Sequence, residues 1–195
     1  MNTYKALTIT AATSITLGIA GLAPLAYFRM QQSQALANAP TVSVPLVAPQ
    51  PVKPAVISGK PVKLVIASLS MNLDVVDGAY NQEKGTWTLS NDKVHYALPT
   101  VQPNNDSGNT LIYGHYRPEV FARLHTIQPG AQAIIDTDNG HRFTYTFQKS
   151  ETVAPDNTDV FTYEGTPRLT IQTCTGAFMQ NRQLYYFDFT SVKAL

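Results

Sequence analysis

The chain has little cysteine and little charge for its 195 residues. Its single cysteine, Cys174, excludes an internal disulfide, so in an exported protein this thiol is either inert or free to react. Charged residues make up 14% of the chain and the net charge is +1, so nothing indicates a nucleic-acid partner. Internal repeats and long runs of like charge are also missing, which favours an ordinary globular domain.

Charge is absent altogether from residues 6–28, between Lys5 and Arg29. As a helix rising about 1.5 Å per residue, this segment is long enough to cross the roughly 30 Å hydrocarbon core of a membrane. It favours a single uncleaved transmembrane helix, with residues 1–5 in the cytoplasm and the rest of the chain outside. The alternative is a cleaved signal peptide, because Ala35-Leu-Ala37 forms an A-x-A cleavage site.

Residues 29–61 are expected to form an extracellular linker. Proline recurs through its second half, among alanine, valine, serine and glutamine. Such a segment favours extended conformations and acts as a semi-rigid spacer. The remaining residues, 62–195, have the usual size of one domain, which this spacer would hold away from the membrane.

This domain shows little helical periodicity but many short strand-like runs. So many short strands predict an all-β fold, either a sandwich or a closed barrel. Asp138-Asn-Gly140 predicts a hairpin. One helix is expected from Pro118, with Phe121, Leu124 and Ile127 on one face. The predicted strands cover residues 62–67, 86–89, 109–113, 131–135, 141–147, 159–163, 168–174 and 183–190.

Three chemically interesting side chains lie at the ends of predicted strands. Alternation along residues 168–174 directs Leu169, Ile171 and Thr173 to the core and Cys174 to the opposite face. The same argument for the next strand, whose core residues are Tyr185, Phe187 and Phe189, places Arg182 beside Cys174 if the two strands form a hairpin. His115 follows Gly114 at the end of a third strand. The residues alone leave other roles open for each, since a buried cysteine is commonly an inert hydrophobe, a lone histidine is more often a surface or core residue, and most arginines are solvated.

Taken together, these positions resemble the sortase family. Residues 109–124 contain Leu-Ile-Tyr-Gly-His and then Phe-Ala-Arg-Leu, similar to the family's strand ending in Gly-His and its Phe-x-x-Leu helix. Leu169-Thr-Ile-Gln-Thr-Cys174 resembles its Thr-Leu-x-Thr-Cys strand, and Arg182 follows where the family has its arginine. The resemblance covers about residues 60–192. Tyr116 and the segment 175–180, which lacks aspartate and proline, depart from the pattern and leave the sortase class open.

The resemblance implies a closed, mostly antiparallel eight-stranded β-barrel with one or two short helices. It also implies a membrane-anchored cysteine transpeptidase that cleaves an LPxTG-like sorting signal between threonine and glycine. In that reaction Cys174 forms a thioester, His115 is the general acid and base, and Arg182 donates to the oxyanion or to the substrate backbone. By family position, residues 156–166 are the expected specificity loop.

The implied partners are surface proteins with a C-terminal sorting signal and an amine such as a peptidoglycan precursor. The implied location is the cell membrane, with the catalytic domain on the extracytoplasmic face. No Asp-Pro-aromatic lid motif is present, which argues against a pilin-polymerising type. No cofactor or metal is expected, because the loop aspartates Asp136, Asp138, Asp156 and Asp159 are better explained as exposed carboxylates than as calcium ligands.

Two other functions stay open from the sequence. One is a secreted cysteine hydrolase that forms the same thioester but transfers it only to water. The other is a catalytically silent, membrane-tethered barrel used for binding.

Overall fold

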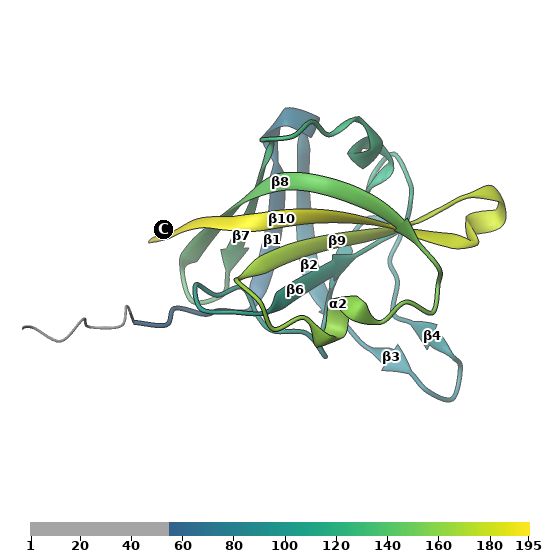
Figure 1. Cartoon of the computed structure of the whole chain (residues 1–195), viewed down its shortest axis with the longest axis horizontal. Helices are drawn as coiled ribbons and strands as arrows, with labels where there is room; N and C mark the ends of the chain where they lie inside the picture. Colours follow the sequence, from purple (N-terminus) through teal and green to yellow (C-terminus); the bar gives the residue numbers. More distant parts are fainter. Residues whose placement is uncertain (1–54) are drawn as a thin grey trace, which may run out of the picture. The chain divides into compact units, whose positions relative to one another are not determined.

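The computed structural model describes residues 55–195. Eight strands close into a barrel in the order β1-β2-β5-β6-β9-β10-β8-β7, and β3 and β4 form a separate two-stranded sheet (Figure 1). This confirms the expected all-β closed barrel with few helices. The barrel strands are β1 (Pro61–Ile66), β2 (Met71–Gly78), β5 (Val94–Ala97), β6 (Asn109–Tyr113), β7 (Gln132–Thr137), β8 (His141–Val153), β9 (Arg168–Thr175) and β10 (Asn181–Ala194). The remaining elements are β3 (Tyr80–Asn81), β4 (Thr86–Trp87), η1 (Ala67–Leu69), η2 (Ala122–Thr126), α2 (Asp159–Thr162) and η3 (Ala177–Met179).

Most neighbouring barrel strands are antiparallel, but β2 with β5 and β6 with β9 are parallel. Parallel strands end at the same edge of a sheet. The parallel ladder therefore brings the end of β6, which leads into His115, and the end of β9, which carries Cys174, to the same end of the barrel. Antiparallel pairing of β9 with β10 then adds the start of β10 to this place.

The expected hairpin at Asp138-Asn-Gly140 is present and joins β7 to β8. Gly140 has a φ of 77°, a left-handed conformation that glycine adopts without steric cost. The turn is closed by a backbone hydrogen bond from Gly140 N to Thr137 O. The sequence signal and the backbone geometry agree here.

Strand β6 is buried on both faces, and this divides the apolar residues into two clusters. Ile112 belongs to the large cluster inside the barrel. Leu111 and Tyr113 point the other way and join Val160 and Leu184 in a second cluster outside the barrel wall. The outer cluster is covered by the segment 154–167, so Thr170 of β9 and Leu184 of β10, which point away from the barrel interior, are buried.

Two predictions of local structure are wrong. The run Asp159–Tyr163 was expected as a strand, but Asp159–Thr162 forms the helix α2. Every edge of the closed barrel is already paired, so this run has no strand to pair with, and a single helical turn closes instead from Phe161 N to Thr158 O. The helix expected from Pro118 begins only at Ala122 and is a 3₁₀-helix, although Phe121, Leu124 and Ile127 are buried on one face as expected.

Strands β2, β3 and β5 had no counterpart among the predicted runs. Strands β3 and β5 span only two and four residues, which is too short to show a clear period. In β2 the buried residues Met71, Leu73 and Val75 do alternate with polar ones, so the sequence carries a strand signal there. Predicted β8 and β10 were shorter than the observed strands, because their extensions, residues 148–153 and 190–194, are mostly exposed and lack apolar alternation. The predicted transmembrane helix at residues 6–28 and the alternative cleavage site lie outside the described residues.

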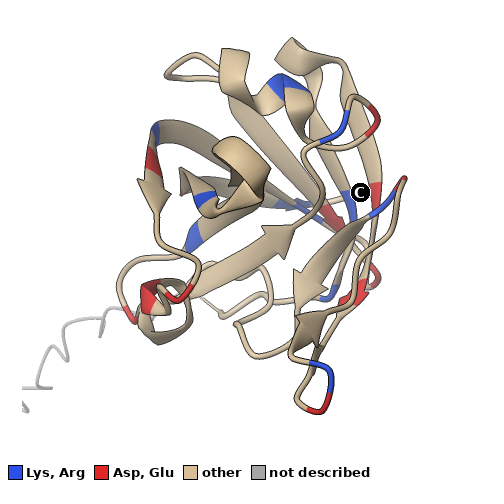
Figure 2. Ribbon diagram, turned by 90° about the vertical axis from the view of Figure 1, so that its right-hand side faces the viewer, with Lys and Arg blue, Asp and Glu red and all other residues tan. Residues whose placement is uncertain are grey.

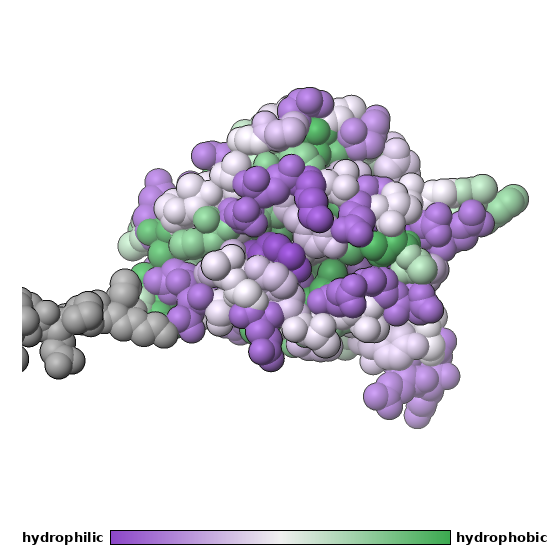
Figure 3. Space-filling model, viewed as in Figure 1, coloured by the Kyte–Doolittle hydropathy of each residue, from purple (hydrophilic) through white to green (hydrophobic). Residues whose placement is uncertain are grey.

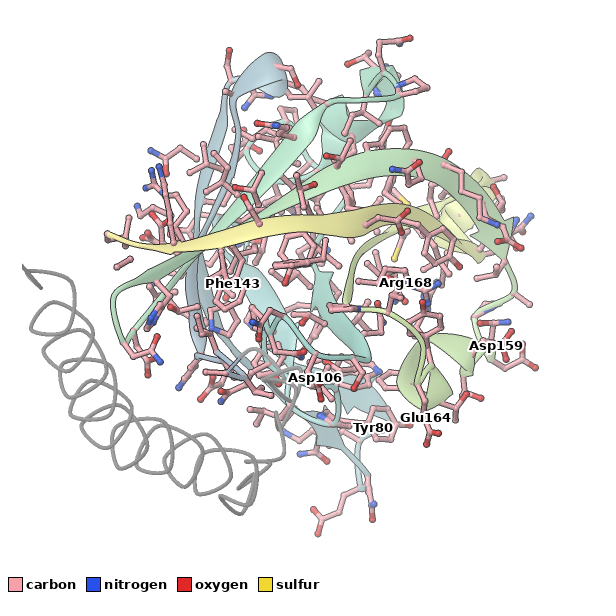
Figure 4. The ribbon with its side chains drawn as sticks, turned by 60° about the vertical axis from the view of Figure 1, so that its left-hand side comes forward. Tyr80, Asp106, Phe143, Asp159, Glu164 and Arg168 are labelled. Carbon is pink, nitrogen blue, oxygen red and sulfur yellow. The ribbon has the colours of Figure 1, made fainter. Side chains whose placement is uncertain are left out.

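Charged side chains are scattered over the barrel, and neither sign gathers into a large patch in the view of Figure 2. Arg168 at the start of β9 has a structural task. Its guanidinium lies over the Tyr163 ring at 3.7 Å and over the Tyr186 ring at 4.7 Å, so it joins the segment after α2 to β10. In Figure 4 Arg168 lies above α2, while Asp159 and Glu164 extend from the outside of this segment.

Asn109 connects α2 to the barrel through hydrogen bonds. It is 3% exposed, and its amide nitrogen donates to the Val160 carbonyl at 2.8 Å. Its amide oxygen accepts a hydrogen bond from the Thr170 hydroxyl at 2.6 Å. One side chain therefore satisfies polar groups of α2 and β9 at once, which fixes α2 over the outer cluster.

Replacing Asn109 with alanine should destabilise the barrel by about 2 kcal/mol, because buried partners lose their hydrogen bonds. Chemical denaturation monitored by circular dichroism measures this. Asn91→Ala, which removes an exposed amide, is the matched control and should change the stability by less than about 0.5 kcal/mol. Equal stability of the two variants would contradict the structural role given to Asn109.

Candidate active site

His115 is held in place through the backbone that precedes it. Gly114 N donates to Gln172 O at 3.1 Å, and the Thr173 hydroxyl donates to Gly114 O at 3.0 Å. The end of β6 is thus tied to the two residues before Cys174. A side chain at Gly114 would meet Val120 Cγ1 at 2.9 Å, so only glycine lets the chain pass here.

Cys174 and Arg182 are direct partners across the β9–β10 ladder. Directly opposite residues of an antiparallel pair point to the same face, with Cβ atoms about 4.5–5.5 Å apart. The hairpin expected from the sequence, with both side chains on one side of the sheet, is therefore confirmed. Both side chains are half-buried.

The three predicted site residues, His115, Cys174 and Arg182, line one cavity of about 570 Å³ on the outer side of the barrel. Leu111 and Phe161 supply part of its apolar wall. The cavity also reaches the expected specificity loop, residues 156–166, through Asn157, Thr158 and Phe161, and it includes Pro155 just before that loop. A nucleophile, a titratable base and a fixed cation in one largely apolar hollow suit acyl transfer.

The imidazole of His115 is shifted toward its neutral form. Burial lowers its pKa from 6.5, and the positive charge of Arg117 and the neighbouring His95 lower it further. Among residues 55–195 no side chain forms a hydrogen bond with this ring. At neutral pH His115 is accordingly a base rather than an acid.

Arg182 makes its hydrogen bonds with one end of its guanidinium. Nη1 donates to Met179 O and to Asn181 O, both at 3.2 Å. Nε and Nη2 make no hydrogen bond within residues 55–195, which leaves donors for an incoming oxygen. The Met179 carbonyl belongs to the β9–β10 loop and the Asn181 carbonyl to the first residue of β10. The loop projects from the barrel with an apolar tip (Figure 3). Its Phe178 is fully exposed.

Hairpin β3–β4 adds cavity residues that the sequence did not indicate. Trp87 stacks on Phe161 of α2, with ring centroids 5.9 Å apart and planes at 8°. The ring of Tyr80 lies on Trp87 in turn, with centroids 5.5 Å apart. Trp87 and Tyr80 both line the cavity. The signal available was Trp87, the chain's single tryptophan, but a two-residue strand outside the barrel has no pattern that points to a site.

A comparison with protein-family models completes the picture of this arrangement. The model for the Sortase domain matches residues 64–187, which is more than half of the chain. The chain belongs to the sortase family. The resemblance inferred from the Gly-His and Thr-Cys motifs is thereby confirmed. Family membership supports a sortase-type cysteine transpeptidase in general terms.

Solved sortases share this fold at low sequence identity. Sortase E1 from Streptomyces coelicolor, solved with a tripeptide in its active site, is 19% identical, with a TM-score of 0.55 over 70% of this chain and 91% of that one. Sortase A from Listeria monocytogenes is 20% identical, with a TM-score of 0.54 over 69% and 90%. Sortase C-1 from Actinomyces oris is 20% identical, with a TM-score of 0.56 over 68% and 76%. A comparison with curated protein sequences yields no match.

The loop aspartates do not gather into a metal site within residues 55–195, where no group of three or more His, Cys, Asp or Glu residues could hold an ion. Asp136 is instead paired with Arg142, whose Nε lies 2.6 Å from Oδ1 and whose Nη2 lies 2.8 Å from Oδ2. This bidentate ion pair joins β7 to the start of β8.

The imidazole of His115 should titrate below pH 6.5 in an NMR titration of the full-length protein. Arg117→Gln should move this midpoint upward, because it removes one of the charges that disfavour the imidazolium. Arg123→Gln removes an exposed arginine of η2 and should leave the midpoint unchanged. A midpoint above 6.5 would contradict the electrostatic description of the site.

Proposed function

We propose that this sortase cleaves an LPxTG-like sorting signal between threonine and glycine and transfers the acyl segment to an amine. Cys174 is the nucleophile, His115 the general acid and base, and Arg182 the oxyanion donor. The observation that carries this proposal is the cross-strand pair of Cys174 and Arg182 in the cavity that also contains His115.

The first half of the reaction follows from the protonation state of His115. Its neutral imidazole takes the proton of the Cys174 thiol as Sγ attacks the threonine carbonyl carbon. Arg182, through its unused guanidinium donors, stabilises the negative charge that develops on the carbonyl oxygen. When the carbon–nitrogen bond breaks, His115 returns the proton to the leaving glycine amine, and the acyl segment remains on Cys174 as a thioester.

The second half reverses the proton transfers with a different amine. Its nitrogen attacks the thioester carbon and gives a proton to His115, and the carbon–sulfur bond breaks. His115 then passes this proton to the departing sulfur, which restores the Cys174 thiol and the neutral imidazole. Cys174 also borders a second cavity, of about 420 Å³, at the mouth of the barrel. This cavity gives the amine a route to the thioester while the acyl segment occupies the first cavity. Its polar lining includes Tyr116, His125, Ser150, Thr175 and Gln183.

The proposed setting is the outer face of the cell membrane, with residues 6–28 as a single-pass anchor and residues 29–61 as the spacer. Support comes from the charge-free length of residues 6–28. The proposed partners are surface proteins that carry a sorting signal and an amine such as a peptidoglycan precursor. Among residues 55–195, none of the helices has the length and apolar character needed to span a bilayer.

Cys174→Ala should abolish turnover of a sorting peptide, and His115→Ala should nearly abolish it. Arg182→Ala should lower the rate about 10²- to 10³-fold, the usual effect of removing one oxyanion donor. Arg182→Lys should recover little of this loss, since a point charge does not replace the planar guanidinium. His141→Ala, at the turn between β7 and β8, is the control and should retain activity. Turnover by folded Cys174→Ala would refute the assignment of the nucleophile.

The products of the reaction separate transfer from hydrolysis. The full-length protein is incubated with Leu-Pro-x-Thr-Gly and Leu-Ala-x-Thr-Gly peptides, with and without glycine-like or peptidoglycan-stem amines, and the products are identified by mass spectrometry. A transpeptidase should shift its product from free acid to amide when amine is added. Free acid with every amine would indicate a hydrolase, and no cleavage by folded protein would indicate a silent binding barrel.

The anchor is tested in whole cells. Intact full-length protein should remain in washed membranes, and protease added outside should digest its domain, because a charge-free segment of this length holds a chain in the bilayer. End-sequencing of the mature protein provides the opposing observation: an N-terminus at Asn38 would show cleavage after Ala35-Leu-Ala37.

A further inference from the structure

Tyr113 is the last residue of β6 and forms part of the cavity wall, although the mechanism above gives it no role. It pairs with His95 of β5 and stacks on the imidazole, with ring centroids 5.5 Å apart and planes at 25°. Trp87 also contacts the tyrosine ring in an edge-on arrangement, with ring centroids 5.2 Å apart. The side chain is only 6% exposed, and it lines the cavity that contains Cys174.

The hydroxyl of Tyr113 lacks a hydrogen-bond partner. Among residues 55–195 it is the only buried side-chain polar atom in this condition. The backbone makes room for it, because a Cβ at Gly78 would lie 2.2 Å from the hydroxyl oxygen. Phenylalanine would fill the same space without leaving a polar atom unpaired, so the free chain gains no stability from this hydroxyl. An unpaired buried group of this kind calls for a partner that arrives from outside the chain.

The hydroxyl suits a hydrogen-bond acceptor in the cavity. Burial raises the pKa of Tyr113 above its ordinary value of 10, so the group stays protonated and able to donate. Its neighbours in the cavity wall, Trp87, Leu111 and Phe161, offer almost no donors to a ligand. An extended peptide brings a row of backbone carbonyls, each of which needs a donor once water is excluded.

We propose that Tyr113 determines substrate recognition by donating a hydrogen bond from its hydroxyl to a backbone carbonyl in the acyl segment of the bound peptide. This rests on the proposed function. The hydroxyl is shielded from solvent in the free chain and Trp87 lies against its ring, so the peptide displaces Trp87 as it binds. Trp87 belongs to hairpin β3–β4, which is outside the barrel and contacts it through aromatic rings. The hairpin therefore moves without breaking a barrel ladder.

The test uses the full-length protein with Cys174→Ala, so that the peptide binds without reacting. A Leu-Pro-Ala-Thr-Gly peptide should change the emission of Trp87, the chain's single tryptophan, and calorimetry should give its Kd. Adding Tyr113→Phe should raise this Kd about 10-fold, the effect of losing one hydrogen bond to the ligand. With Cys174 present, Tyr113→Phe should raise KM and leave kcat within a few fold, because the lost contact is remote from the reacting atoms.

Tyr96→Phe is the matched control. Tyr96 is 3% exposed, and its hydroxyl donates to the Thr100 carbonyl inside the barrel. Removing that hydroxyl should lower the melting temperature and leave the Kd unchanged. Tyr113→Phe should do the reverse, with a melting temperature equal to that of the parent or higher. This contrast separates a role in binding from a role in folding.

Peptide analogues identify the accepting carbonyl. In each analogue one backbone carbonyl is replaced by an alkene. The analogue that lacks the accepting carbonyl should bind the parent about 10-fold more weakly than the unmodified peptide does. The Tyr113→Phe variant should bind this analogue and the unmodified peptide with equal Kd. Equal Kd values for the parent and Tyr113→Phe would overturn the inference and leave the proposed function standing. A parent that binds none of the peptides would overturn both.

Discussion

The site depends on the parallel pairing of β6 with β9. This ladder continues past the end of β6 through the hydrogen bond from Gly114 to Gln172 and the one from Thr173 to Gly114. It sets where His115 lies relative to Cys174, two residues far apart in sequence. A shift of one residue in this register would turn Cys174 into the barrel and Thr173 out of it. The buried residues of β9, Leu169, Ile171 and Thr173, oppose that shift because their burial would be lost.

The outer side of the barrel depends on a second set of contacts. Asn109 holds α2 from within the wall, and Arg168 holds the segment after α2 between two tyrosine rings. These contacts place Phe161 so that Trp87 stacks on it and closes the cavity. A barrel wall that is buried on both faces thus supplies part of the apolar lining of the cavity that contains Cys174, His115 and Arg182.

The strand period was sufficient to predict the sides of Cys174 and Arg182, because alternation along β9 and β10 is regular. Sequence reasoning failed for Asp159–Thr162, whose β-branched and aromatic residues suit a strand but whose surroundings offer no free edge. It also failed for Trp87 and Tyr113, since their place in the cavity depends on packing between a hairpin, a helix and a barrel strand. The roles of the glycines were also only partly predictable. Gly114 was recognised beside His115, but the role of Gly78 became apparent only from its contact with Tyr113.

The central claim is that Cys174 forms a thioester with the acyl segment of a sorting peptide. Intact-mass measurement of the full-length protein, taken soon after mixing with peptide in the absence of amine, tests this most directly. The account predicts a mass increase equal to the acyl segment, located on Cys174 and removed by hydroxylamine as the hydroxamate. Absence of any adduct from folded protein with a titratable thiol, or an adduct on another residue, would contradict it.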